Sequence, residues 1–287
     1  MTDPRSVPEE GETPEALHPL TGVAQTLLIP LYVRATESRR VDALLRDDKA
    51  LGVVERWKAD FSFIDALELD DGDRVTIILR NREFDRHAAR FMAEHPRALV
   101  VHIGCGLDAR FERVDDGYVE WYDLDLPEVI VARKQVIGSK GPRHHLLGCS
   151  VFDKAWMEVV GGEGSRPILF IAEGVLMYFD EAQVRSLVRG LLDRFRGSEL
   201  VFDAFSPFLV RANNRRISRT GIGASYRWGL RRASDLEAWG PGIRLLEEWF
   251  PLSHPEPRLR LYRWVRFIPV LAKVMGIFHY RLGDAAA

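Results

Sequence analysis

The amino-acid sequence predicts an α/β fold, with a parallel sheet covered by helices on both faces. Three observations lead to this prediction. Short apolar runs of strand length alternate with amphipathic segments of helix length through the middle of the chain. One run, 99–103, leads directly into a glycine turn, and a mainly helical pattern, 21–94, precedes it. Strands that are separated by helices pair in parallel, because each helix carries the chain back across the sheet.

The composition is that of an ordinary globular protein, and the length allows one large domain or two small ones. Of its 287 residues, 46% are hydrophobic, and the net charge of −2 gives no reason to expect a nucleic-acid partner. Two cysteines, Cys105 and Cys149, make neither a disulfide framework nor a zinc cluster. The start of the chain resembles no secretory signal, and the longest apolar stretch, 267–280, is broken by Pro269 and Lys273. We therefore expect a cytoplasmic protein without a membrane partner, and the oligomeric state stays open.

The first third of the chain is predicted to be a tail followed by a helical cover. Residues 1–20 are rich in proline, glutamate and threonine and offer little to bury, which is typical of a disordered tail. Residues 21–97 carry apolar positions at helical spacing and would form the cover. Within them, the acidic stretch 70–73 is predicted to be a turn, and a helix over 81–95 would end before Pro96.

The central segment, 98–205, begins with the feature that suggests a ligand. The buried strand 99–103 runs into Gly104 and Gly106, which let the backbone turn sharply and approach a ligand closely. A second strand ends in Asp123 and Asp125, about 20 residues beyond the turn, where an acid can accept the hydroxyls of a ribose. The two aspartates share a strand face, so spacing does not choose between them. This combination predicts a cofactor that contains adenosine.

The βα alternation then continues to residue 205. Helices are predicted over 127–137 and 181–196, the first with proline at its start and the second with glycine at its end. Further strands are expected at 144–147, 168–172 and 199–205.

The alternation of strands and helices stops in the last part of the chain. Residues 206–242 are predicted to be an insertion that forms the acceptor pocket, because such a break late in an α/β domain suits substrate recognition. Residues 243–283 would complete the sheet with strands at 245–252 and 276–282 and a helix at 260–275 between them.

Several motifs together resemble one family. Gly-Cys-Gly-Leu-Asp-Ala-Arg at 104–110, Asp-Leu-Pro-Glu at 125–128 and Glu-Gly-Val-Leu-Met-Tyr at 173–178 match the leucine carboxyl methyltransferase superfamily in order and spacing. Ser-Val-Phe-Asp at 150–153 and Arg-Ala-Thr-Glu-Ser at 34–38 resemble its bacterial polyketide O-methyltransferase branch. The resemblance covers about residues 21–283. It implies a Rossmann-like class I methyltransferase with a seven-stranded, mostly parallel sheet, and S-adenosyl-L-methionine as the cofactor.

The resemblance also implies roles for individual residues. Gly104 and Gly106 would let the backbone approach the cofactor, and Asp125 would hold its ribose. Arg82 would bind the methionine carboxylate with its planar guanidinium, helped by Arg34. The remaining predicted cofactor contacts are Cys149 and Ser150 at the adenine edge and Glu173 at the end of the fourth strand. Because the eukaryotic branch has an aspartate where Cys149 stands, the adenine contact here would use the backbone or Ser150.

These motifs predict a methyl transfer to a small molecule, with the acceptor group left open. A carboxylate of an aromatic, polyketide-type compound is ionised at neutral pH and needs no general base. A phenol would need one, and His102 or Tyr178 would be the candidates. The glycine spacing also fits an NAD(P)-dependent oxidoreductase, although no Tyr-x-x-x-Lys pair accompanies it. A non-catalytic protein that only binds the cofactor is the third alternative.

Other candidate features are given ordinary interpretations. His144 and His145 point to opposite faces of a strand, so no metal site is expected. The basic run 211–216 is predicted to be a solvated helix face, with attraction of an anionic acceptor as the alternative. Aromatic residues, which either line the acceptor pocket or fill the core, are Phe205, Phe208, Tyr226, Trp228 and Trp239.

Overall fold

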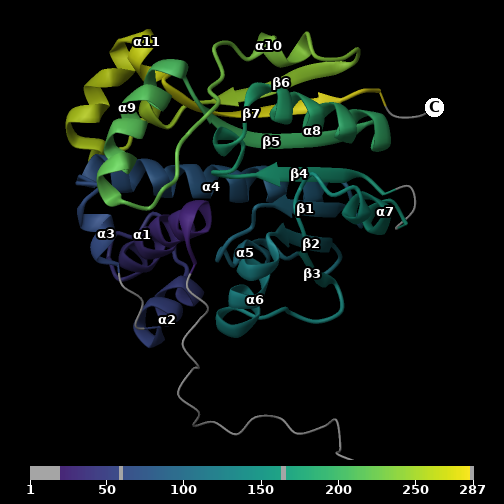
Figure 1. The fold of residues 1–287 in the computed structure, drawn as a ribbon, viewed down its shortest axis with the longest axis horizontal. Helices are drawn as coiled ribbons and strands as arrows, with labels where there is room; N and C mark the ends of the chain where they lie inside the picture. The colour runs from purple at the N-terminus through teal and green to yellow at the C-terminus, as the bar shows by residue number, and fades with distance from the viewer. Residues whose placement is uncertain (1–19, 58–60, 163–165, 285–287) are drawn as a thin grey trace, which may run out of the picture.

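The computed structural model describes residues 20–57, 61–162 and 166–284. They form a seven-stranded sheet with helices on both faces (Figure 1). The predicted tail, 1–20, lies outside the described residues except for Leu20. The strands are β1 (Leu99–Ile103), β2 (Glu120–Asp125), β3 (His144–Gly148), β4 (Ile168–Ala172), β5 (Ser198–Phe205), β6 (Ile243–Trp249) and β7 (Met275–Leu282).

The strand order is β3-β2-β1-β4-β5-β7-β6. Strands β1 to β5 pair in parallel, whereas β7 lies antiparallel between β5 and β6. This arrangement confirms the predicted seven-stranded, mostly parallel sheet of a Rossmann-like methyltransferase. The order reverses between the adjacent strands β1 and β4, and ligands of open α/β sheets bind at such a switch point, beyond the carboxyl ends of the strands.

The central strands are buried on both faces. Every residue of β1 and β4 is buried, as the apolar run at 99–103 predicts. On one face, Val101 belongs to a core shared with helices α7 (Ala155–Gly161) and α8 (Glu181–Arg194). On the other face, Val100 packs in a core with helix α4 (Asp71–Glu94). Alternate side chains of one strand thus hold two helical layers, which gives the site a rigid base.

The helical cover differs from the prediction at its most acidic point. Residues 70–73 are not a turn: Asp70 caps α4, and its side chain and that of Asp73 each accept a backbone N–H from the other residue. The helix therefore begins ten residues before the predicted start at 81. No helix among the described residues is both long and apolar enough to cross a bilayer, and charged side chains interrupt even the 24-residue α4. The other cover elements are η1 (Gly22–Leu27), α1 (Leu28–Ser38), α2 (Asp48–Arg56) and α3 (Ser62–Asp65).

The prediction of a helix over 260–275 is also wrong. The chain forms a 3-10 segment, η5 (Pro257–Phe267), and one short helix, α11 (Pro269–Ala272), before β7 begins. Pro269 cannot donate a helical hydrogen bond and disfavours helical geometry at Ile268, so one continuous helix is not possible. The remaining elements are α5 (Arg110–Val114), α6 (Pro127–Val136), η2 (Leu176–Tyr178), α9 (Pro207–Ile217), η3 (Ser218–Thr220), α10 (Ser234–Glu237) and η4 (Pro251–Ser253).

Candidate functional site

A cavity of about 810 Å³ lies over the carboxyl ends of β1, β2 and β4, at the switch point of the sheet. The cover closes it from one side through η1, α1 and α4, and the segments α9, η5 and α11 border its other end. All predicted site residues except Arg82 line this cavity: Arg34, His102, Gly104, Gly106, Asp125, Cys149, Ser150, Glu173 and Tyr178.

The glycine turn after β1 requires its two glycines. Gly104 and Gly106 adopt φ angles of 64° and 52°, in the left-handed region that side chains disfavour. A Cβ on Gly104 would lie 2.2 Å from Cγ2 of Val175, and one on Gly106 would lie 3.4 Å from Cβ of Leu27. The backbone of the turn can therefore lie directly against its neighbours on both sides of the cavity.

The structure separates the two aspartates that the sequence could not distinguish. Asp123 is fully buried; its carboxylate pairs with Arg133 and lies 2.7 Å from Nε2 of His144. Asp125 faces the cavity and accepts backbone N–H groups of Gly106 (2.8 Å) and Leu126 (2.7 Å). Burial raises the pKa of Asp125 to about 6, although these two N–H groups act to lower it. Each of its oxygens keeps a lone pair for a ligand hydroxyl.

Cys149 and Ser150 follow β3 at the same edge of the cavity. The N–H of Cys149 donates to the backbone oxygen of Asp125 at 2.9 Å, which fixes this loop beside the end of β2. The hydroxyl of Ser150 accepts the N–H of Phe152 at 3.3 Å. Cys149 thus lies beside Asp125, and Ser150 follows it at this edge of the cavity.

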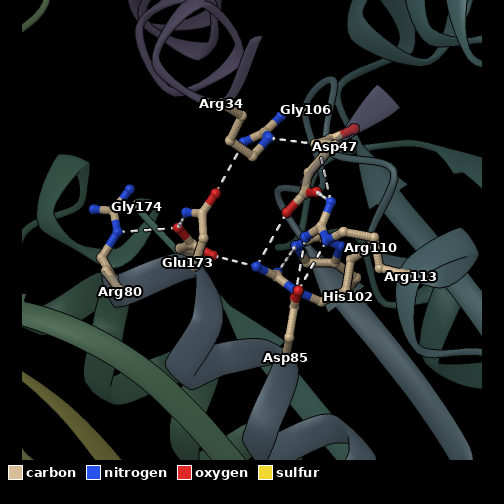
Figure 2. A network of polar contacts seen from close by, with 12 residues as sticks. Arg34, Asp47, Arg80, Asp85, His102, Gly106, Arg110, Arg113, Glu173 and Gly174 are labelled. Atoms are coloured by element: carbon tan, nitrogen blue, oxygen red, sulfur yellow. Dashed lines mark hydrogen bonds and ion pairs between the residues drawn. The ribbon is translucent and has the colours of Figure 1, made fainter. Parts of the chain in front are cut away.

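The side chain of Glu173 is only 7% exposed, and its charge is paired within the protein. The sequence leaves ligand or solvent as its partners, because an unpaired buried carboxylate is costly. The structure gives a different solution: Glu173 accepts hydrogen bonds from Arg80 (3.0 Å), Asn81 and Arg110 (Figure 2). Arg80 and Asn81 belong to the cover and Arg110 to α5, so Glu173 joins these elements at the end of β4.

Arg82, the predicted carboxylate contact, has an exposed side chain that does not line the cavity. Two residues along a helix correspond to a turn of about 200°, so Arg80 points the opposite way, into the cavity. Burial would lower the pKa of Arg80, but Asp203 and Glu173 outweigh it and raise that pKa. Its hydrogen bonds to these two acids use Nε and Nη1, so within the described part of the chain Nη2 stays available to a ligand carboxylate.

Arg34 lines the cavity but is committed to the protein. Its guanidinium donates to Asp47 (2.8 Å), to the backbone oxygen of Leu107 (2.8 Å) and, more weakly, to Asn81 (3.4 Å). It therefore ties α1 to the loop that follows the glycine turn. These contacts position the cover over the cavity, and the predicted cofactor contact of Arg34 stays a prediction.

Neither candidate base is placed as an effective proton acceptor. His102 is buried in β1 with Nε2 3.1 Å from Nη1 of Arg110. Burial, assisted by the charge of Arg110, lowers its pKa despite the opposing effect of Asp123. The Tyr178 hydroxyl donates to Oγ1 of Thr26 at 3.0 Å, and burial raises its pKa well above the ordinary value.

The far end of the cavity is mainly apolar. Of the aromatic candidates, Phe205, Phe208 and Tyr226 line it. Trp228 and Trp239 do not; they pack against each other in the main core, with ring centroids 6.1 Å apart.

Arg216, from the basic run 211–216, also lines this end. It is held by Asp73 at 2.8 Å and by the backbone oxygen of Leu67 at 2.8 Å. The run is therefore partly buried, and it is not only a solvated face as predicted.

The paired histidines of β3 have separate partners. His144 approaches Asp123 at 2.7 Å, and His145 approaches Glu120 at 3.0 Å on the other face. Within the described residues, the grouping that a metal ion could use is His87, Glu247 and His279, which lies outside the cavity. Both oxygens of Glu247 are already paired, with Arg86 and Arg90.

Comparison with known proteins supplies the family. The model of the leucine carboxyl methyltransferase family matches residues 28–192. The tetracenomycin polyketide synthesis O-methyltransferase TcmP of Streptomyces glaucescens is 34% identical over 237 residues, which cover 82% of this chain and 86% of that protein. The chain belongs to the leucine carboxyl methyltransferase family. It is therefore an S-adenosylmethionine-dependent methyltransferase, as the motifs predict, and not an NAD(P)-dependent oxidoreductase.

Other relatives of this methyltransferase agree with the assignment. The S-adenosyl-L-methionine-dependent methyltransferase dpfgK of Gibberella zeae is 30% identical over 264 residues, covering 86% of this chain and 88% of its own length. The crystal structure of a Thermobifida fusca YX protein assigned as a methyltransferase shares 18% identity, with a TM-score of 0.56. It covers 88% of this chain and 94% of that one, which supports the fold.

The cavity of this methyltransferase fits its cofactor. Gly104 and Gly106 contribute no side chain to the cavity that they line, and Asp125 offers two acceptor oxygens beside the turn. Arg80 offers Nη2 to a carboxylate from the side of the cover. The sequence analysis names Arg82, which stands two residues after Arg80; the phase of the helix is the signal that separates the two side chains.

Proposed function

We propose that this methyltransferase transfers a methyl group to a carboxylate oxygen of a small aromatic molecule of polyketide type. The name of the relative TcmP supports this class of acceptor, and so does the apolar end of the cavity. Side chains at that end include Phe205, Leu209, Tyr226, Val274 and Met275.

The observation that carries the choice of a carboxylate is the state of the titratable groups around the cavity. Glu173 is paired with arginines. The lowered pKa of His102 makes it a weak base, and the raised pKa of Tyr178 keeps its hydroxyl protonated at neutral pH. Asp125 lies in the cofactor half, beside the glycine turn. A carboxylate is already ionised at neutral pH, whereas a phenol with a pKa near 10 would need an effective base.

The residues of the site would act by binding and alignment. Bound S-adenosylmethionine supplies a methyl group on a sulfonium cation, which an aligned carboxylate oxygen can accept as the sulfur becomes a neutral thioether. Asp125 would accept the ribose hydroxyls, and Arg80 would hold the amino-acid carboxylate. The apolar end, with Phe205 and Tyr226, would exclude water around an acceptor of opposite charge, which favours a reaction that cancels charge.

The test is the identity of the product. The purified enzyme is incubated with S-adenosylmethionine and either a naphthoic acid or the corresponding naphthol, and the products are analysed by mass spectrometry. We expect a methyl ester from the acid that mild base hydrolyses. A base-stable aryl ether from the naphthol, with no ester from the acid, would show that phenols are the acceptors. Binding of S-adenosylhomocysteine without turnover of an extended panel of aromatic acids would favour a non-catalytic role.

Two expectations about the surroundings of this enzyme stay predictions of the sequence. They are the cytoplasmic location and the lack of a nucleic-acid partner, for which the net charge of −2 is the support.

A further inference from the structure

Two segments at the outer end of the cavity carry an unusual distribution of charge. The segments 206–221 and 257–275 contain nine cationic residues and no carboxylate, in a chain whose net charge is −2. They form α9, η3, η5 and α11, which lie together at one end of the molecule (Figure 1). We call these two segments the basic rim. Its cations are Arg211, Arg215, Arg216, Arg219, Arg258, Arg260, Arg263, Arg266 and Lys273. Five of them are paired with carboxylates of neighbouring elements: Arg216 with Asp73, Arg219 with Glu68, Arg258 with Glu37, Arg260 with Asp71 and Lys273 with Glu248. The other four, Arg211, Arg215, Arg263 and Arg266, are exposed.

The basic rim also exposes large apolar side chains. Trp264, Phe267 and Val270 are 57%, 63% and 81% exposed, and the first two rings contact each other with centroids 6.1 Å apart. The guanidinium of Arg263 lies over the ring of Trp264 at 5.0 Å, and that of Arg266 over Phe267 at 4.7 Å. Apolar rings and cations are therefore presented side by side on one surface, in contact with solvent.

This surface is continuous with the cavity. Phe208 of α9 and Leu271 of α11 are 61% and 40% exposed, yet both line the cavity. The two segments also meet directly, since the N–H of Ser206 donates to the backbone oxygen of Val274 at 2.7 Å. An apolar acceptor that reaches the far end of the cavity would thus pass between residues of the basic rim.

The chemistry of the basic rim selects among its possible partners. A second copy packed about a two-fold axis would bring the same cations against one another, which is unfavourable. A surface of arginines with exposed tryptophan and phenylalanine matches a segment that lies in the interface of an anionic bilayer, where rings enter the headgroup region and cations meet lipid phosphates. The observations on charge and exposure favour the lipid surface over a protein.

We propose that the basic rim docks this enzyme on the surface of an anionic lipid bilayer and turns the mouth of the cavity toward the membrane. This departs from the sequence expectation of no membrane partner, which considered only spanning segments. The contact is peripheral: Trp264 and Phe267 would insert at the level of the headgroups, and Arg263 and Arg266 would pair with lipid phosphates. The proposal does not depend on which acceptor oxygen is methylated.

Co-sedimentation of the full-length protein with vesicles tests this proposal. The vesicles are phosphatidylcholine alone or phosphatidylcholine mixed with phosphatidylglycerol. We expect binding to the anionic vesicles, loss of binding at high salt, and little binding to phosphatidylcholine alone. The R263E/R266E variant should bind at least about tenfold more weakly, since each basic residue contributes about 1 kcal/mol at such a surface. The W264S/F267S variant should also bind more weakly.

A matched control makes the result specific. The R185E/R189E variant makes the same change of charge on exposed residues of α8, outside the basic rim, and should keep most of the binding. Binding of S-adenosylhomocysteine to each variant shows that it is folded. The proposal is overturned if the wild-type protein ignores anionic vesicles or if the α8 variant loses as much binding. It is also overturned if light scattering shows that W264S/F267S dissociates a dimer, because the basic rim is then a subunit interface.

Discussion

Arg80 Nε donates a hydrogen bond of 3.0 Å to Glu173 Oε1, and this contact joins helix α4 of the cover to the end of strand β4. The same guanidinium donates from Nη1 to Asp203 at 2.9 Å. Arg80 lines the cavity and is therefore held there by two acids, through Nε and Nη1. The two acids orient a cation that would otherwise be costly to bury, and we propose that it binds the carboxylate of the cofactor.

Replacing Arg80 should weaken cofactor binding more than replacing Arg82. We expect R80K to bind S-adenosylhomocysteine about ten- to a hundredfold more weakly in calorimetry, because lysine keeps the charge but loses the planar fork. R82A, which removes an exposed side chain of the same helix, should stay within about twofold. Equal losses in the two variants, or a loss in R82A alone, would restore the sequence prediction.

The pH dependence of cofactor binding should report Asp125. Its pKa of about 6 means that the carboxylate is protonated in acid and then accepts ribose hydroxyls less well. The affinity for S-adenosylhomocysteine should fall about tenfold between pH 7 and pH 5 if only the ionised form binds. D125N should bind weakly and without this dependence. A wild-type affinity that does not change over this range would remove Asp125 from the ribose site.

The stability of the ligand-free protein should depend on pH through Asp125 in the opposite direction to cofactor binding. The folded state raises this pKa above its unfolded value, so the stabilising contribution is complete below about pH 4 and is lost as the pH rises through about 6. Thermal unfolding measures this. The melting temperature of D125N minus that of the wild-type protein should be higher at pH 7 than at pH 4.

Gly104 should tolerate no side chain. A Cβ there would lie 2.2 Å from Val175 Cγ2, and the φ angle of 64° is strained for alanine. G104A should lower the melting temperature and weaken cofactor binding. G104A/V175A removes the contact with Val175 Cγ2 but not the backbone strain. It should therefore recover only part of the melting temperature and part of the cofactor affinity. A wild-type melting curve and affinity for G104A would show that the turn does not need its glycine.

Methylation of a carboxylate should survive the loss of either candidate base. Y178F and H102Q should keep kcat for an aromatic acid within about fivefold, whereas loss of a general base costs about a hundredfold or more. Because His102 is buried beside Arg110, its variant is compared at equal folded fraction, measured by thermal unfolding. A hundredfold lower kcat in folded Y178F, with KM unchanged, would show that a base is used.

The sequence predicts the strands well because each one is a short buried run. The expected strand at 99–103 coincides with β1, and the run at 168–172 coincides with β4. The glycine turn and Asp125 follow from spacing within one βαβ unit, so they too are predictable. The predicted turn at 70–73 is wrong, because aspartate and glycine are as common at the start of a helix as in a turn.

The parts of the site that depend on distant contacts could not be predicted. Glu173 is paired by Arg80, 93 residues away, and by Arg110, 63 residues away. No local sequence pattern indicates partners at such distances along the chain. The choice between Arg80 and Arg82 depends on the phase of α4, and that phase could not be read while the helix was placed ten residues too late.

A crystal structure of the enzyme with S-adenosylhomocysteine is the most direct test of the proposed site. We predict the adenosine over the turn at Gly104 and Gly106, the ribose hydroxyls on Asp125, and the amino-acid carboxylate on Nη2 of Arg80. The account is contradicted if the ligand binds outside this cavity, or if its carboxylate is held by another residue while Arg80 keeps only Glu173 and Asp203.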